Sequence, residues 1–200
     1  MILEGLVTTL GPEGLLNVAP MGPRVEGPDL NRFVLRPYRS STTYRNLKAH
    51  GEGVFHVTDD TLMIAQTVLR LKIDPPTRPA LNVRGSVLTG ACRYAEFRVC
   101  SLQDQEERTT ITVETVTQGQ LRDFFGFNRA KHAVLEAAIL ASRTAILPRA
   151  EILAEFQRLR VWVEKTGGPD EQAGFELLYD HVTRASGSEP SEIRNSEAPR

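Results

Sequence analysis

Apolar and polar residues alternate with the period of a β-strand through most of the first 120 residues. Ala95, Phe97 and Val99, for example, alternate with Glu96 and Arg98, as in a strand that buries one face. The first two apolar runs flank the turn sequence LGPEG and predict a hairpin. In chain order, strands are predicted at residues 2–9, 14–19, 31–38, 53–60, 80–91, 93–103 and 108–119.

Two short helices are predicted among these strands. Residues 40–51 begin with a run of Ser and Thr that can cap a helix, and they end at a glycine that can stop one. Residues 61–72 follow Asp60 or Thr61 as the cap, and the helix is expected to end at the proline pair after them.

The pattern changes beyond residue 120. Three runs carry the stripe of an amphipathic helix, at residues 128–143, 148–165 and 169–184. The last sixteen residues are polar and unpatterned, as in a disordered tail. We therefore expect a β-rich domain at 1–120, a helical extension packed on it at 121–184, and a disordered tail at 185–200.

The fold class predicted from this order is mainly β with α. Six or seven antiparallel strands with one short helix after the third favour a small closed or partly closed barrel. Helices do not alternate with strands, so a doubly wound parallel sheet is not expected. The GxGxxG fingerprint of dinucleotide-binding folds and the P-loop motif are both missing from the sequence.

Composition narrows the function classes. Lys and Arg number 24 against 25 Asp and Glu, so no overall positive field attracts nucleic acid or a membrane surface. No apolar run reaches the roughly 18 residues of a membrane span. The first ten residues, MILEGLVTTL, lack the basic start of a signal peptide, so a cytoplasmic location is expected. Any anion site must be local.

The cysteines and histidines favour neither a disulfide nor a metal site. Cys92 and Cys100 would lie about 26 Å apart along one continuous strand, far beyond disulfide reach. The four histidines have no metal-ligand spacing with one another or with the cysteines. We predict free thiols and no metal.

The segment RPYRSSTTYRNLK, residues 36–48, is the main candidate for chemistry. Backbone N–H groups at a helix start, four consecutive hydroxyls and nearby guanidinium groups are typical of a phosphate site. One hydroxyl is enough to cap a helix, whereas Ser40, Ser41, Thr42 and Thr43 supply four. The alternative is an ordinary capped helix.

Two other segments are open to a structural and a functional interpretation. The segment NVAPMGP, residues 17–23, ends a predicted strand without a bulky side chain. It can present its peptide groups to a flat ligand, or it can be an ordinary turn that ends the strand. In FHVTDD, residues 55–60, His56 is a candidate cofactor-binding residue, although a buried and hydrogen-bonded histidine is the usual case in a strand.

The segment FFGFNRAKHAVLEA, residues 124–137, precedes and begins a predicted helix. Its three phenylalanines are expected to lie in the core. Asn128, Arg129 and Lys131 could instead face an anionic ligand, because they lie at the helix start.

In this order, NVAPMGP, LRPYRSSTTYRNL and GVFHVTDD make the chain resemble the flavin reductase-like, FMN-binding split-barrel proteins, and within them a family described as a domain of unknown function. The similarity covers roughly residues 1–145. It implies a six-stranded antiparallel split β-barrel that forms a homodimer with non-covalent FMN near the interface. By analogy, the phosphate meets Arg36, Arg39, Ser41, Thr42 and Thr43, and the isoalloxazine edge lies against Asn17, Ala19, Pro20 and Met21.

The same resemblance implies an oxidoreductase in which electrons pass through FMN from a small-molecule donor to an acceptor. No catalytic residue is identified, because the cofactor carries the chemistry. Two alternatives remain at this point: a non-catalytic carrier or sensor that binds flavin or another phosphometabolite, and a scaffold whose helical extension binds a protein.

Overall fold

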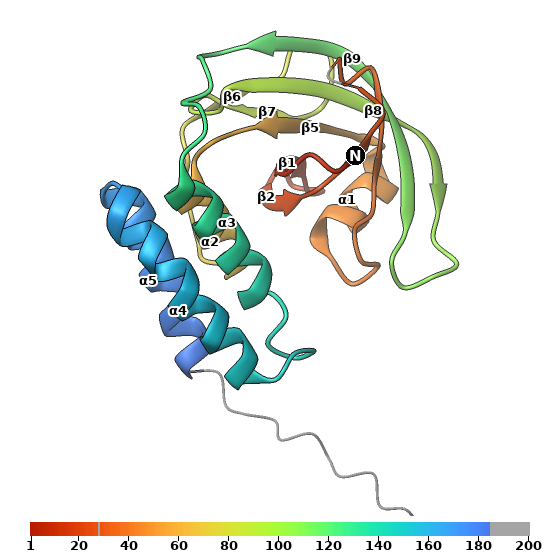
Figure 1. Cartoon of the computed structure of the whole chain (residues 1–200). Helices are drawn as coiled ribbons and strands as arrows, with labels where there is room; N and C mark the ends of the chain where they lie inside the picture. The colour runs from red at the N-terminus through yellow and green to blue at the C-terminus, as the bar shows by residue number, and fades with distance from the viewer. Residues whose placement is uncertain (28, 185–200) are drawn as a thin grey trace, which may run out of the picture.

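The structure is a computed structural model and describes residues 1–27 and 29–184, so the predicted tail at 185–200 lies outside the described residues. It is mainly β with five helices, and an antiparallel sheet curls into a half-barrel beside a group of helices (Figure 1). In spatial order the sheet consists of β2 (Leu16–Met21), β1 (Gly5–Leu10), β5 (Glu52–Val57), β8 (Arg93–Gln103), β9 (Thr110–Gln120), β4 (Arg32–Leu35) and β3 (Arg24–Val25).

The sheet has seven strands, so the expected number of six is wrong. The additional strand is β3, which pairs with β4 inside the Pro- and Gly-rich connection after β2. Two residues are too few to produce an alternating pattern, and the prolines and glycines around them indicate only a turn. The predicted first hairpin is confirmed by the pairing of β1 with β2.

Only residues 86–88 of the strand predicted at 80–91 form a strand, and it is not part of the seven-stranded sheet. This part of the chain forms a separate two-stranded hairpin, β6 (Thr77–Pro79) with β7 (Ser86–Leu88), whose connecting residues lie over β8. There the backbone N–H groups of Leu81 and Asn82 donate to the two carboxylate oxygens of Glu96, at 2.8 and 2.7 Å. Glu96 alternates with apolar residues as expected, yet it is fully buried because the hairpin covers its face.

The concave face of the sheet encloses an aromatic core. Phe33 of β4 contacts Phe55 of β5 and Phe97 of β8, with ring centroids 5.7 and 5.6 Å apart. Helix α1 (Thr42–His50) adds Tyr44 and Leu47 to this core. Packing of α1 into the half-barrel therefore fixes where the helix begins, which is the position of the candidate anion site.

The two helices among the strands begin where the sequence predicts. Ser41 caps α1 by accepting a hydrogen bond from the N–H of Tyr44, and Gly51 ends it in the left-handed conformation. Asp60 caps α2 (Thr61–Val68) by accepting from the N–H of Met63. Helix α2 ends four residues earlier than expected, because Arg70 adopts a positive φ of 55° well before the prolines.

The last three helices pack against α2 and one end of the sheet (Figure 1). They are α3 (Arg129–Ala141), α4 (Arg149–Thr166) and α5 (Pro169–Arg184), close to the predicted ranges. Leu6 of β1 and Leu88 of β7 join their apolar core, so these helices and the sheet share buried surface. Within residues 1–27 and 29–184, none of the helices has the length and apolar character needed to cross a bilayer.

Candidate functional site

The start of α1 is held in place by the hairpin of β8 and β9. The N–H of Arg39 donates to the carbonyl of Glu107 at 2.9 Å, and the hydroxyl of Thr109 donates to the carbonyl of Pro37 at 2.7 Å. The guanidinium of Arg108 stacks on the ring of Tyr38, 5.5 Å from its centroid. The segment before the helix is therefore fixed by contacts with the sheet, which suits a site that must hold a ligand in one position.

Arg45 joins the hydroxyl groups at this helix start. Its guanidinium donates to the carbonyl of Ser40 at 2.8 Å and to the hydroxyl of Thr42 at 2.9 Å. We did not single out Arg45 from the sequence. The signal was present, since residues three apart on a helix are neighbours and Arg45 follows Thr42 by three.

A second group of polar side chains joins α1 to the hairpin of β1 and β2. The amide of Asn17 donates to the hydroxyls of Thr9 and Thr43, at 3.2 and 3.1 Å. Asn46 also donates to Thr9, at 3.0 Å, and it is buried together with Thr9 and Thr43. The structure thus brings together Asn17, expected at the flavin ring, and Thr43, expected at the phosphate.

The arginines before α1 carry the local positive charge. Arg36 is half-buried, and its buried Nε has no hydrogen-bond partner among the described residues. Arg39 is exposed and lies near Asp104, at the tip of the β8–β9 hairpin. Hydrogen bonds from Lys48 and Tyr44 lower the pKa of Asp104, so this carboxylate is already paired. An orphaned guanidinium N–H beside a helix start fits an anionic ligand.

The residues expected at the flavin ring lie on the edge strand β2. Ala19, Pro20 and Met21 pair with β1 on one side, and no described strand pairs with their other side. Pro20 suits this position, because it lacks an N–H and edge strands tolerate proline. One long side of β2 therefore has no strand partner among residues 1–27 and 29–184.

His56 differs from the other candidates because it lies inside the protein. It is fully buried on β5, where Nε2 accepts from the N–H of Leu88 at 3.0 Å and Nδ1 lies 3.4 Å from the carbonyl of Leu6. Burial lowers the pKa of His56 to about 4, with the contact to Leu6 opposing the shift. The ring is neutral at pH 7, and both of its nitrogens face protein groups.

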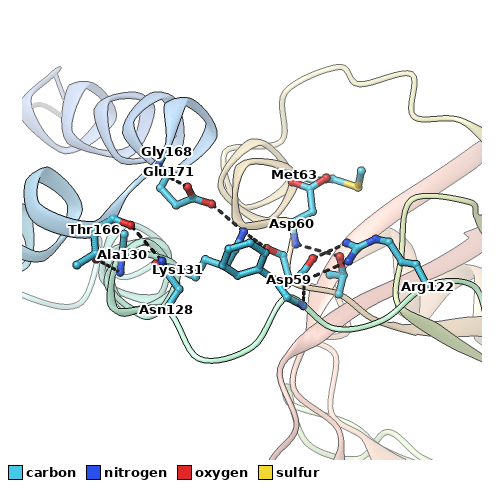
Figure 2. A network of polar contacts seen from close by, with 12 residues as sticks. Asp59, Asp60, Met63, Arg122, Asn128, Ala130, Lys131, Thr166, Gly168 and Glu171 are labelled. Atoms are coloured by element: carbon cyan, nitrogen blue, oxygen red, sulfur yellow. Dashed lines mark hydrogen bonds and ion pairs between the residues drawn. The ribbon is translucent and has the colours of Figure 1, made fainter.

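The phenylalanines before α3 are exposed, so their expected place in the core is wrong. Phe124, Phe125 and Phe127 are 52, 70 and 96% exposed. The segment between β9 and α3, which contains these phenylalanines, lies along a polar network (Figure 2). Its backbone is held by hydrogen bonds, such as that of the N–H of Phe125, rather than by burial of the rings.

Asp59 is the centre of that network (Figure 2). Its carboxylate accepts from both terminal nitrogens of Arg122, with Nη1 of Arg122 3.1 Å from Oδ2, and from the N–H of Phe125 at 2.7 Å. The hydrogen bond from Arg122 is the main cause that lowers the pKa of Asp59 to about 2. Asp59 is therefore ionised at any physiological pH.

Lys131 extends this network to α5. Its Nζ donates to the backbone carbonyl of Asp59 at 2.9 Å and to the carboxylate of Glu171 at 2.8 Å, and Glu171 also accepts from the N–H of Gly168. Asn128 caps α3, and the guanidinium of Arg129 lies over the ring of Trp162. These three residues, which could have faced a ligand, all make contacts within the protein.

Two other expectations concern cysteine and metal chemistry. Cys92 is buried and Cys100 is exposed, and both are free thiols, as predicted. Within the part of the chain that the structure describes, no three His, Cys, Asp or Glu side chains are placed to hold a metal ion.

Two family models match the chain. The model for the N-terminal domain of a protein of unknown function, DUF447, matches residues 3–122, and a second DUF447 model matches residues 128–180. Together they span most of the described residues. No curated protein matches the chain at a significant level.

Solved structures show the same fold. The FMN-bound DUF447 protein MM1853 from Methanosarcina mazei is 22% identical, with a TM-score of 0.75 over 90% of this chain and 94% of its own. The 2-nitrobenzoate 2-nitroreductase NbaA of Pseudomonas fluorescens is 20% identical, with a TM-score of 0.51 over 58% of this chain and 64% of its own. Nitrilotriacetate monooxygenase component B of Bacillus cereus is 16% identical, with a TM-score of 0.51 over 60% and 70%.

Proposed function

The chain belongs to the DUF447 family, as its motifs indicated, and we propose that it is an FMN-binding flavoprotein of the flavin reductase-like, split-barrel type. The observation that carries this proposal is the hydrogen bond between Asn17 and Thr43, which joins the strand expected at the ring to the helix expected at the phosphate. A relative of the same fold and family was crystallised with FMN, which supports the choice of ligand.

In this proposal the FMN phosphate lies at the start of α1. Ser41, Thr42 and Thr43 provide hydroxyls, the first turn provides backbone N–H groups, and Arg36 and Arg39 provide positive charge. The isoalloxazine edge lies along the unpaired side of β2, at Asn17, Ala19, Pro20 and Met21. His56 supports β1 and β7 from behind, since both ring nitrogens already face protein groups.

Bound FMN would supply hydride and electron transfer, and the protein would orient the ring and hold the phosphate. We propose an oxidoreductase that takes electrons from a small-molecule donor. We further propose a homodimer with FMN near the interface, an FMN-binding domain at 1–120 and a helical extension at 121–184. The family models meet close to that boundary, at residues 122 and 128, which supports the division. The cytoplasmic location stays a prediction from the sequence.

The absorbance spectrum of the purified protein tests FMN binding. We expect visible flavin bands, or their appearance after added FMN and removal of the excess, with release of free FMN on denaturation. A protein that stays colourless and leaves FMN fluorescence unquenched at micromolar concentration would rule the proposal out. Sedimentation of the FMN-loaded protein tests the dimer.

Reduction of the bound FMN by NADH or NADPH, followed by reoxidation with added acceptors, tests the oxidoreductase. Steady turnover is the expected result. Tight FMN binding without reduction by either donor would instead favour a carrier or sensor.

A further inference from the structure

We propose that Asn17 and Arg45 are positioning residues that keep the hydroxyls at the start of α1 as hydrogen-bond donors, so that the site selects a doubly ionised phosphate. This inference rests on the proposed FMN site and concerns how that site recognises its ligand.

The argument starts from the direction of three hydrogen bonds. Ser41 accepts from the backbone N–H of Tyr44 at 3.1 Å, Thr42 accepts from Arg45 at 2.9 Å, and Thr43 accepts from the amide of Asn17 at 3.1 Å. A peptide N–H, a guanidinium and an amide NH₂ can only donate. Each hydroxyl oxygen is therefore used as an acceptor, and its own proton is left for another partner.

None of these three hydroxyls donates to an acceptor within residues 1–27 and 29–184. Hydroxyls elsewhere in the protein behave in both ways: Thr67 donates to the carbonyl of Met63 at 2.9 Å and Thr166 donates to that of Trp162 at 2.8 Å. Thr9 and Thr58, in contrast, only accept within the described residues. Three neighbouring hydroxyls with unused protons at a helix start suit a ligand that accepts several hydrogen bonds. A phosphate dianion is such a ligand, since its three terminal oxygens carry no proton.

The charged groups around this helix start favour the same ligand. Three of these groups are arginines: Arg36 and Arg39 lie in the segment before the helix, and Arg45 lies in α1. Two are acidic, Asp104 and Glu107, and both lie on the β8–β9 hairpin. Strand β2 has no charged residue. The pKa of Asp104 is lowered by its hydrogen bonds from Lys48 and Tyr44, so it stays ionised at pH 5. The histidine of α1, His50, lies at the other end of the helix.

The test is the affinity of the full-length protein for FMN and for riboflavin, measured by quenching of flavin fluorescence. Since the second pKa of a phosphate monoester is about 6, roughly one tenth of FMN is doubly ionised at about pH 5. We expect FMN to bind about tenfold more weakly at about pH 5 than at about pH 7.5, with riboflavin unchanged. Equal FMN affinity at the two pH values would overturn the inference.

Variants test the two positioning residues. Arg45→Met and Asn17→Ala should each reduce the preference for FMN over riboflavin and flatten its pH dependence, because Thr42 and Thr43 can then turn their protons away. Asn46→Ala is the matched control for Asn17, since Asn46 donates to Thr9 and has no side-chain hydrogen bond to Thr43 among the described residues. Lys48→Met controls for the loss of one positive charge from α1.

The outcomes separate this inference from the proposed function. FMN binding by the parent protein, with an unchanged preference and pH profile in Arg45→Met and Asn17→Ala, contradicts the positioning role alone. Failure of the parent protein to bind either flavin contradicts the proposed function itself. Restoration of the preference by Arg45→Lys would show that charge is sufficient and that the paired contacts of Arg45 are not needed, which also overturns its positioning role.

Discussion

Asn17 of β2 donates a hydrogen bond to the hydroxyl of Thr43 in the first turn of α1, at 3.1 Å, although the two residues are 26 positions apart in the chain. The same amide reaches Thr9 of β1 at 3.2 Å. One side chain therefore connects the first hairpin to the helix start. If the amide holds these elements together, Asn17 and Thr43 must also depend on one another energetically.

A double-mutant cycle measures that dependence. Asn17→Ala and Thr43→Val should each lower the free energy of unfolding by about 1 kcal/mol, because each leaves a partner without its hydrogen bond. We expect the double variant to lose less than the sum, with a coupling energy of about 0.5–1.5 kcal/mol in urea denaturation. Strict additivity would show that the contact contributes nothing.

The buried imidazole of His56 makes stability depend on pH. Its pKa is about 4 in the folded protein, against 6.5 when exposed, because burial disfavours the charged ring. Between these values the unfolded chain binds a proton that the folded protein does not. Stability is therefore complete above about pH 6.5 and falls as the pH is lowered towards 4, by about 3 kcal/mol in total.

Imidazole NMR signals check the His56 prediction. The ring of His56 should stay neutral down to about pH 5, with its titration centred near pH 4. The exposed rings of His132 and His181 provide reference signals in the same spectrum. A His56 signal that titrates near pH 6.5 would contradict the prediction.

Local signals predicted most of the fold. Ser41 and Asp60 cap helices as expected, and strand β8 has the predicted bounds, because caps and alternation act within a few residues. The half-barrel depends on pairing between segments far apart in the chain, such as β1 with β5 and β4 with β9, which no local pattern contains. Strand β3 pairs with its neighbour β4, but its two residues are too few to produce an alternating pattern.

The candidate site could also be predicted only in part, because the sequence shows local patterns but not the contacts between segments far apart in the chain. The hydroxyl run at Ser41 to Thr43 was visible in the sequence, whereas the link from Thr43 to Asn17 arises only when β2 meets α1. Glu96 shows the limit clearly. Alternation placed it correctly opposite the aromatic core, but its burial comes from a hairpin that covers the other face of the sheet.

A second pH effect is expected at lower pH, from Asp59. Its pKa is lowered to about 2, chiefly by the hydrogen bond from Arg122, whereas an unperturbed aspartate has a pKa of 3.8. This contribution is complete above about pH 4 and is lost as the pH falls towards 2. After allowance for solvent screening, it amounts to about 1 kcal/mol.

The variant Asp59→Asn isolates this effect in acid denaturation curves. It should destabilise the protein by about 2 kcal/mol at pH 7, because Arg122 loses its ionic partner, and it should be less sensitive to acid between pH 4 and 2. Asp60→Asn is the matched control, since an amide oxygen can still cap α2 by accepting from Met63. Equal acid sensitivity of Asp59→Asn and the parent protein would exclude the assignment.

Lys131 should contribute more to stability than an exposed ion pair does. Its Nζ joins Asp59 to Glu171, and the two charged side chains of the Lys131–Glu171 pair are only 20 and 10% exposed. We expect Lys131→Met to cost about 2 kcal/mol in urea denaturation, because the part-buried carboxylate of Glu171 loses its ionic partner and is left with backbone N–H groups such as that of Gly168. Arg158→Met, which breaks an exposed pair with Glu155, should cost less than about 0.5 kcal/mol.

The exposed phenylalanines before α3 predict a sharp contrast between residues of the same type. Phe127 is 96% exposed, so Phe127→Ser should change the free energy of unfolding by less than about 0.5 kcal/mol. Phe97 is fully buried against Phe33, and Phe97→Ala should cost about 3–5 kcal/mol through lost burial and a cavity. Urea denaturation of both variants at one protein concentration measures the difference. A large loss in Phe127→Ser would mean that this ring is covered in solution, and a loss that shrinks on dilution would identify a second copy of the chain as the cover, since dilution removes the stabilisation that association gives the parent protein.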